Sequence, residues 1–311
     1  MRPMISTLTS CYRGDKYLPT FLEQVPNQTA FDRLEIVIDL NAPSKDELRC
    51  VKDFQERYPD HLKYMVQDKV VTYSASWNNC IRAASGEYLA IWNIDDLRTP
   101  VSIEVEAKCL DDNPEIGLVH GKYNVVREFG STEGRPYRDN EKNTKAPASE
   151  ASRRFLFGPF YMFRKSLIEK AGYMDEQFRS SADFDHTVRL TLNTRFAAVK
   201  DCLGYYLNAG LGLSSRSDSP IDIENFVIRM RYGIYDKMWY HYLAASSDYD
   251  YYKILNGNDW LPVGNFVKDY RTMLEERYKM YFDIGYIHHI GFKSKEKMFG
   301  LDGIKMLLQK R

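Results

Sequence analysis

The chain has 311 residues, of which 43 are Lys or Arg and 43 are Asp or Glu. This length suits one large α/β domain, alone or with a smaller appendage. The balanced charge excludes an overall field that would draw the protein to nucleic acid, so we expect no nucleic-acid partner. The five cysteines contain no Cys-x-x-Cys pair, which predicts reduced thiols of a cytoplasmic protein and no zinc site. No stretch reaches the roughly 18 apolar residues of a membrane span, so we expect no transmembrane segment.

The first part of the chain alternates between strand and helix patterns. Residues 4–9 alternate as a strand does, and apolar residues recur at helical spacing over 18–25. A second apolar strand covers 35–40, and Ser44 and Glu47 have the spacing of a capping box that opens a helix.

The same alternation continues to the middle of the chain. A third strand covers 62–66, and a helix that carries Trp77 precedes the apolar strand 88–92. Thr99 and Pro100 predict the cap and the first position of the next helix. Strands that alternate with helices indicate an α/β fold, with a mostly parallel central sheet covered on both faces.

Polar residues follow three of these strands. Thr9 and Ser10 end the first strand, residues 39–41 end the second, and residues 93–96 follow the fourth. Ligands of parallel sheets bind beyond the carboxyl ends of the strands. We therefore expect a binding site at this edge of the sheet.

The sequence Asn93-Ile94-Asp95-Asp96 is a small acidic cluster at the end of an apolar strand. Hard divalent cations are often held by one or two carboxylates together with the phosphates of a substrate. The cluster therefore predicts metal-assisted chemistry on a nucleoside diphosphate, with Asp95 and Asp96 as metal ligands. The alternative is that these two carboxylates cap the helix that follows.

A second acidic position, Asp183, falls in the first turn of a predicted helix whose buried side carries Phe184, Val188 and Leu192. The free N–H groups at a helix start favour an ionised carboxylate. Such a carboxylate suits a general base that accepts a proton from a hydroxyl. Helix capping is again the alternative.

Beyond Pro220 the chain becomes rich in Tyr and Met and loses its strand pattern, which predicts a helical extension. We therefore divide the chain into a domain of residues 1–220 and an extension of residues 221–311. The extension would either shape an acceptor site or mediate a homodimer. Its last helix, over 304–311, is amphipathic and basic, so it would pack on the main domain or contact the inner face of the membrane.

Taken in order, these motifs resemble the family-2 glycosyltransferases with the GT-A fold, over about residues 4–215. The matching segments are residues 9–13, Gln28-Thr29, Asn78, residues 84–88, residues 93–96, which fall on the family's Asp-x-Asp-Asp, residues 172–178, and Ala182-Asp183.

The resemblance implies inverting transfer of a sugar from a nucleotide sugar to a saccharide or glycolipid hydroxyl, in cell-surface polysaccharide synthesis. By position, Asp95 would bind Mn²⁺ or Mg²⁺ with Asp96 beside it, and Asp183 would be the catalytic base. Arg216 lies where the family often closes a loop over the diphosphate. The implied contacts of the nucleotide sugar are Thr9, Ser10, Tyr12, Asp39, Asn41, Asn78, Asn93, Asp95 and Asp96.

Three positions depart from the family's pattern. Residues 40–43 replace its Asp-Asp-Gly-Ser, which leaves Asn41 or Asp39 to contact the base, and the donor and acceptor of an Asn amide suit uracil. Asn93 stands in place of an Asp, and Ala182 in place of a Glu. These departures favour the alternative of a catalytically silent nucleotide-sugar-binding scaffold. A nucleotidyltransferase or a dinucleotide-dependent oxidoreductase is disfavoured, since no Gly-rich phosphate loop follows the first strand.

Overall fold

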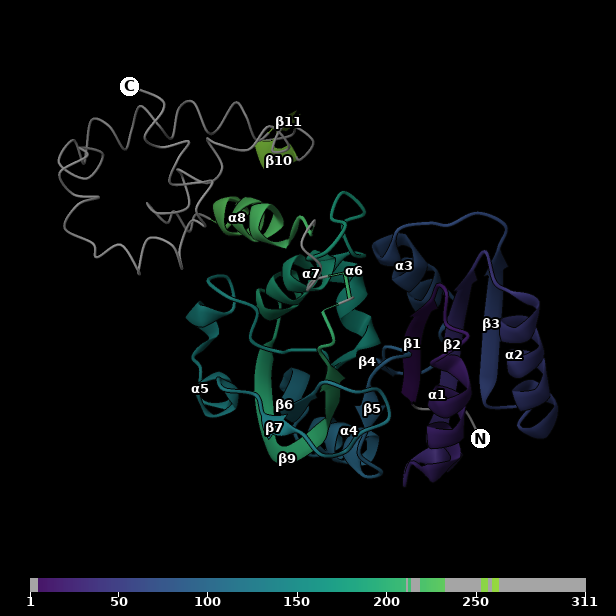
Figure 1. Ribbon diagram of the computed structural model, residues 1–311. Coiled ribbons are helices and arrows are strands. Elements are labelled where there is room, and N and C mark those ends of the chain that lie inside the picture. The colour runs from purple at the N-terminus through teal and green to yellow at the C-terminus, as the bar shows by residue number, and fades with distance from the viewer. Residues whose placement is uncertain (1–4, 211, 214–218, 233–252, 257–258, 263–311) are drawn as a thin grey trace, which may run out of the picture. The chain divides into compact units, whose positions relative to one another are not determined.

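The computed structural model describes residues 5–210, 212–213, 219–232, 253–256 and 259–262 (Figure 1). The chain forms two compact units, Met1–Ser219 and Pro220–Arg311. Arg216 and the predicted basic helix over 304–311 lie outside the described residues. None of the described helices is long and apolar enough to cross a membrane.

A nine-stranded mixed sheet forms the centre of the first unit, in the order β3-β2-β1-β4-β8-β6-β9-β5, with β7 paired to β6. Strands β3, β2, β1 and β4 are parallel, β8 runs antiparallel between β4 and β6, and β9 is parallel to β6. The strands are β1 (Ile5–Cys11), β2 (Leu34–Asn41), β3 (Leu62–Gln67), β4 (Tyr88–Ile91), β5 (Leu97–Arg98), β6 (Ile116–Val126), β7 (Arg135–Pro136), β8 (Tyr161–Arg164) and β9 (Arg195–Leu207).

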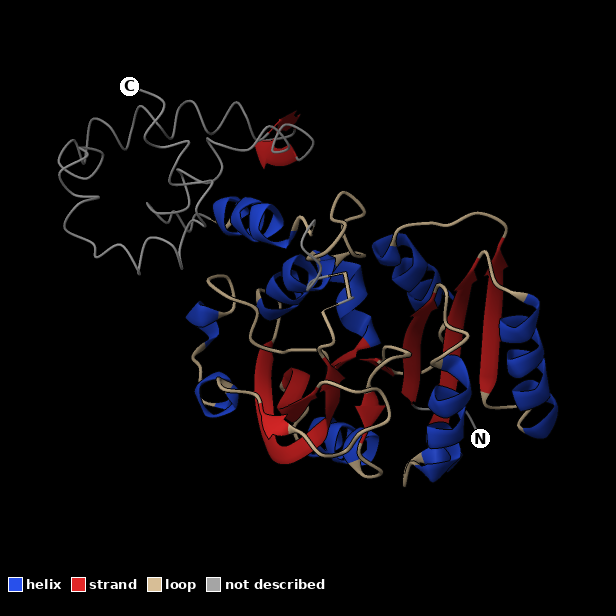
Figure 2. Ribbon diagram, viewed as in Figure 1, coloured by secondary structure: helices blue, strands red, loops and turns tan. Residues whose placement is uncertain are grey.

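Helices pack around these strands (Figure 2). They are α1 (Leu18–Gln24), α2 (Lys45–Arg57), α3 (Tyr73–Ala83), α4 (Ser102–Asp112), α5 (Asn140–Thr144), α6 (Ile168–Ala171) and α7 (Ala182–Thr191). Alternate residues of β2 face opposite sides of the sheet. Ile36, Ile38 and Leu40 join an apolar core with α1, α2 and α4, whereas Asp39 bonds to Asn79 of α3. The expected sheet with helices on both faces is thereby confirmed.

Local capping was predicted correctly at α2 and incorrectly at α4. The Ser44 hydroxyl accepts from the N–H of Glu47, and the Glu47 carboxylate accepts from the N–H of Ser44, which completes the capping box. The helix expected at Pro100 begins at Ser102, and its N-cap residue is Val101. Thr99 does not cap it because its hydroxyl donates to the Cys202 carbonyl at 2.9 Å, beside the pairing of β5 with β9.

A buried ion pair lies between β5 and α4. The side chains of Arg98 and Glu106 are both 0% exposed, and their Nη1 and Oε2 atoms are 2.5 Å apart. Nη2 of Arg98 also donates to the Ile91 carbonyl at 2.8 Å, so the guanidinium ties β5 to the end of β4. This end leads directly into the acidic cluster.

We expect Arg98→Met to lower the free energy of unfolding by about 3–5 kcal/mol, because Glu106 would remain buried without its partner. The double variant Arg98→Met, Glu106→Leu is expected to recover most of this loss, since it leaves no unpaired charge. Urea denaturation of both variants checks the expectation. Equal losses in the single and double variants would contradict it.

The described residues of the second unit form α8 (Ile221–Arg231) and an antiparallel hairpin of β10 (Lys253–Asn256) and β11 (Asp259–Pro262). The hairpin was not expected, since no strand was predicted after residue 220, and the helical extension of residues 221–311 as a whole stays a prediction. Asn256-Gly257 between two apolar stretches is a hairpin signal, so the sequence did carry the information. The homodimer expected through this extension stays a prediction.

Candidate active site

The predicted polar strand ends are neighbours in the structure. The strand order β2-β1-β4 places the carboxyl ends of these three parallel strands side by side. Ser10 stands opposite Asp39 in the register of β1 and β2, and it is partly exposed. The buried hydroxyl of Thr9 donates to the Trp92 carbonyl at 2.8 Å. Thr9 thus fixes the residue that precedes the acidic cluster.

Residues 93–96 form a tight turn, here named the acidic turn, which is held by hydrogen bonds through Asp96. The Asp96 carboxylate accepts from the Asn93 amide at 2.9 Å and from the N–H of Leu207 in β9 at 3.0 Å. The Trp92 indole donates to the Asp96 carbonyl at 3.2 Å. The next helix, α4, begins only at Ser102, and its N-cap residue is Val101. Asp95 and Asp96 therefore do not cap a helix, and the helix-capping interpretation is wrong.

The two carboxylates of the acidic turn are poor in neutralising partners. Asp96 is 1% exposed, whereas Asp95 is partly exposed. Burial raises the pKa of both, and the neighbouring Asp95 raises that of Asp96 further, while the Arg98 guanidinium acts in the opposite direction. A bound cation would relieve both the repulsion and the loss of hydration.

A cation would need further ligands at this turn. Among the described residues, no group of three or more His, Cys, Asp or Glu side chains is arranged to hold a metal ion. Two carboxylates completed by water and by substrate phosphates are nevertheless a set that Mg²⁺ accepts. The donor chemistry of Asp95 and Asp96 therefore fits a cation that binds together with a diphosphate.

The loop after β1 packs against the acidic turn. The N–H of Gly14 donates to the Glu47 carboxylate at 2.5 Å, and a Cβ atom at Gly14 would lie 2.9 Å from Cδ1 of Ile94. Before this glycine, Arg13 has a left-handed φ of 53°, and its guanidinium lies 5.1 Å from the centre of the Tyr12 ring. Tyr12 of the same loop is 44% exposed, so its ring is free to stack on a flat ligand.

Asp39 and Asn41 are buried and hydrogen-bonded within the protein. The Asp39 carboxylate accepts from Gln67 at 2.8 Å and from Asn79 at 3.2 Å. The Asn41 amide donates to the Ser76 hydroxyl at 3.0 Å, and its oxygen accepts from the N–H of Val71 at 3.2 Å. Asp39 is 0% and Asn41 1% exposed, so a nucleotide base would contact either residue only after the side chains that cover it move.

Helix α3 holds the segment that leads to Asp183. The Asn78 amide donates to the carbonyl of Met174 at 2.9 Å and accepts from its N–H at 2.8 Å. The Ser74 hydroxyl donates to the Phe178 carbonyl at 3.1 Å, and the Tyr73 hydroxyl accepts from the N–H of Ala182. Asn78 therefore braces this segment. Tyr73 and Ser74 hold the same segment, and neither was predicted, because no local pattern marks partners about a hundred residues away.

Asp183 lies in the first turn of α7, after the N-cap residue Ser181, and it is partly exposed. Its carboxylate accepts from the N–H of Phe184 at 2.8 Å. Asp183 therefore does not occupy the cap position, and its bond to a free N–H of the first turn favours the ionised carboxylate that a base requires.

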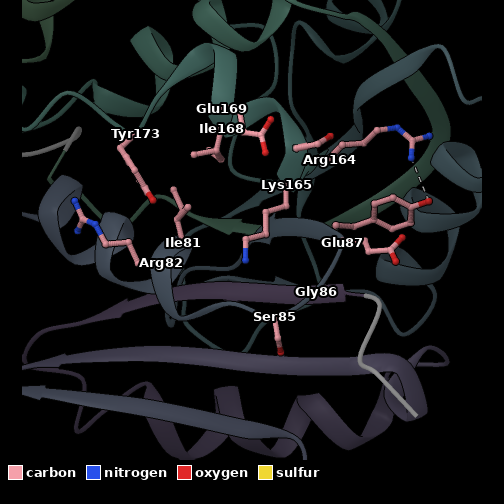
Figure 3. Close-up of a pocket in the computed structure, with 12 residues that line it drawn as sticks. Ile81, Arg82, Ser85, Gly86, Glu87, Arg164, Lys165, Ile168, Glu169 and Tyr173 are labelled. Atoms are coloured by element: carbon pink, nitrogen blue, oxygen red, sulfur yellow. Dashed lines mark hydrogen bonds between the residues drawn. The ribbon is translucent and has the colours of Figure 1, made fainter.

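A separate hollow of about 610 Å³ lies at the opposite edge of the sheet, where β4 begins (Figure 3). Gly86, Glu87 and Lys165 are among the residues that line it. The cationic side chains that line it are hydrogen-bonded to the protein itself: Arg164 donates to the Tyr88 hydroxyl at 3.4 Å, and Lys165 donates to the Ala84 carbonyl at 2.5 Å. Because it contains none of the predicted site residues, we place the candidate active site at the other edge.

Two buried histidines predict a loss of stability in acid. Burial lowers the pKa of His120 to about 4 and that of His186 to about 3, from an ordinary 6.5. Between about pH 4 and pH 6.5 these two imidazoles are therefore protonated in the unfolded state but stay neutral in the folded state. The free energy of unfolding should fall as the pH drops from about 6.5 towards 4, by about 1.4 kcal/mol per pH unit for each histidine.

Urea denaturation from pH 7 to pH 5 measures this slope, and His186→Phe should remove one of the two contributions. The raised pKa values of Asp95 and Asp96 act in the opposite direction, so the informative quantity is the difference in slope between the variant and the original protein. Identical slopes would contradict the assignment of His186.

A family profile and two proteins of related sequence match this chain. A profile described as glycosyl transferase family 2 matches residues 6–172. The chain is 25% identical over 209 residues to an uncharacterized glycosyltransferase of Methanocaldococcus jannaschii, which covers 66% of this chain and 71% of that protein. It is 26% identical over 128 residues to the Bacillus subtilis protein EpsE, named as a glycosyltransferase, which covers 41% of this chain and 46% of that protein.

Two solved structures have a similar fold. The first is S. aureus TarS 1-349 in complex with UDP-GlcNAc, with a TM-score of 0.60, 16% identity, and coverage of 99% of this chain and 81% of that chain. The second is the mannosyltransferase PcManGT from Pyrobaculum calidifontis in complex with GDP-Man and Mn²⁺, with a TM-score of 0.57, 20% identity, and coverage of 76% and 65%. Both likenesses confirm the expected GT-A fold.

Proposed function

The chain belongs to glycosyl transferase family 2, and we propose that it transfers a sugar from a UDP-sugar to a hydroxyl of a saccharide or glycolipid acceptor, with inversion at the anomeric carbon. The proposed setting is cell-surface polysaccharide synthesis. The observation that carries the proposal is the acidic turn: two carboxylates with raised pKa values lie beside the Tyr12 loop at the shared edge of β1, β2 and β4.

The donor is proposed to bind across this edge. Asp95 and Asp96 would hold Mn²⁺ or Mg²⁺ between the protein and the diphosphate, where the ion would neutralise charge on the departing nucleoside diphosphate. Tyr12 would stack on the base, and Asp39 or Asn41 would bind its edge once the side chains that bury them move. The choice of uracil is supported by the donor and acceptor of Asn41 and by the UDP-GlcNAc bound to TarS.

Asp183 is proposed to accept the proton of the acceptor hydroxyl. As the O–H bond breaks, the oxygen's electron pair forms the new bond to the anomeric carbon, and the bond from that carbon to the diphosphate breaks. The carboxylate is suited to this role because it is partly exposed and already hydrogen-bonded in its ionised form by the N–H of Phe184. Attack opposite the leaving group inverts the anomeric carbon without a covalent enzyme intermediate.

A catalytically silent nucleotide-sugar-binding domain is the second candidate. Asn93 and Ala182 favour it, since each replaces a carboxylate of the family's pattern. In the structure, however, Asn93 donates to Asp96 and thereby supports the remaining carboxylate. The second candidate would bind the nucleotide with metal but would transfer no sugar.

A calorimetric titration of UDP, GDP and dTDP, each with Mn²⁺ and then with a chelator, tests the proposal. We expect UDP to bind most tightly and to lose most of its affinity with the chelator. GDP is included because PcManGT is in complex with GDP-Man. Absence of binding by all three nucleotides to the folded protein would overturn the proposed function. Metal-dependent binding without turnover of any UDP-sugar would favour the silent domain.

A further inference from the structure

Two polar side chains beneath the start of α7 are buried without hydrogen-bond partners in the part of the chain that the structure describes. They are Tyr161, whose hydroxyl is unpaired, and His120, whose two ring nitrogens are both unpaired. Each is 1% exposed. Buried polar atoms are nearly always hydrogen-bonded, so orphans of this kind need an explanation such as an internal water or a bond completed in the working state.

Tyr161 and His120 stand next to each other on the sheet. They are directly opposite in the antiparallel pairing of β8 with β6, so both side chains leave the same face, about 5 Å apart at their Cβ atoms. The ring of Phe157 links them, with its centre 5.0 Å from that of His120 and 6.4 Å from that of Tyr161. The two orphaned groups therefore belong to one pocket in the core.

The face that carries this pair is the one on which α7 packs. Phe163, two residues after Tyr161 on the same face of β8, has its ring centre 5.5 Å from that of His186 in α7. The ring centre of Phe184, also in α7, lies 6.1 Å from that of Phe155. Tyr161 is thus close to the first turn of α7, which carries Asp183. In agreement, the Asp183 carboxylate adds to burial in raising the pKa of the Tyr161 phenol.

We infer that in the working state Tyr161 and His120 complete a hydrogen-bonded relay that positions the carboxylate of Asp183, a role that rests on the proposed function of Asp183 as the base. The Tyr161 hydroxyl donates to Asp183, directly or through one water, and accepts from a ring N–H of His120. Tyr161 is a positioning residue and touches no substrate.

The donors and acceptors of the three side chains agree with this direction of the hydrogen bonds. Burial lowers the pKa of His120 to about 4, so at neutral pH the ring has one N–H donor and one acceptor. A phenol can donate once and accept from that N–H, and an ionised carboxylate can only accept. The series of hydrogen bonds therefore ends at Asp183, because an ionised carboxylate is the one group of the three that cannot donate.

Other titratable groups near Asp183 already have partners. Asp185 pairs with Arg189 at 2.8 Å, the His186 ring lies 3.2 Å from the Gly172 carbonyl, and Tyr73 of α3 accepts from the N–H of Ala182.

The test is Tyr161→Phe, which removes one hydroxyl and keeps the ring. Titration of ¹³C-labelled aspartate by NMR, with the Asp183 resonance assigned by its absence in Asp183→Asn, should show the Asp183 midpoint rising by about one pH unit, because the ionised form loses a donor. We expect kcat at neutral pH to fall about tenfold and UDP affinity to stay unchanged. His120→Leu should shift the midpoint less, and it should shift nothing further in the Tyr161→Phe background.

Tyr88→Phe is the matched control. It removes the partly buried hydroxyl of a tyrosine that bonds to Asp111 at 2.7 Å, at the opposite edge of the sheet. This variant is expected to lose stability without moving the Asp183 midpoint. An unmoved midpoint in folded Tyr161→Phe, or additive effects of the two variants, would overturn the inference. The NMR titration needs no turnover, so this failure differs from that of the proposed function, which would appear as absent nucleotide binding or transfer.

Discussion

Replacing Asp183 by asparagine is expected to lower kcat for sugar transfer by about 10²–10⁴-fold, the usual contribution of a general base. The asparagine is nearly isosteric, and its oxygen can still accept from the N–H of Phe184. The helix start should therefore remain, and only the capacity to take a proton is lost. Steady-state rates together with the calorimetric affinity for UDP measure the effect, and the affinity should not change.

Two further variants separate the role of Asp183 from a general effect of charge. Asp112→Asn removes an exposed carboxylate at the end of α4 and should leave transfer unchanged. Asp183→Glu keeps a carboxylate but displaces it by about one methylene, so it should recover only part of the rate. Full transfer by folded Asp183→Asn would remove this residue from the mechanism and leave the base to be found elsewhere.

Features that follow from a local pattern, or from a general rule of parallel sheets, were predictable from the sequence. The capping box of Ser44 and Glu47 has all of its partners within four residues, and the structure confirms it. The convergence of residues 9–10, 39–41 and 93–96 followed from the rule for parallel sheets, because the order β2-β1-β4 brings three successive polar ends together.

Features that depend on distant pairing were not predictable. Thr99 has the composition of a cap, but the pairing of β5 with β9 gives its hydroxyl a carbonyl acceptor more than a hundred residues away. Asn78 matched a motif, yet its bracing of Met174 depends on how α3 packs. The pairing of Tyr161 with His120 likewise depends on the β6–β8 register, which no local pattern specifies.

Replacing Asp95 by asparagine is expected to weaken UDP binding in the presence of Mn²⁺ by at least about tenfold, because a site with few charged ligands loses one of them. Asp95 is the better residue to change, since it is partly exposed, whereas the buried Asp96 also bonds to the N–H of Leu207 and supports β9. Calorimetry with Mn²⁺ and with a chelator measures the effect. The chelator should then make little further difference, because the metal-dependent part of binding is already lost.

The reverse change, Asn93→Asp, tests the same metal site by adding a carboxylate to it. It replaces the amide that donates to Asp96 with a third carboxylate. Without metal, repulsion among three acidic side chains should lower the melting temperature, and with Mn²⁺ the temperature should rise by more than it does in the original protein, because binding to the folded state stabilises it. If Asp95→Asn keeps its metal-dependent affinity and Asn93→Asp gains none, the acidic turn is not the metal site, and its raised pKa values have a purely structural origin.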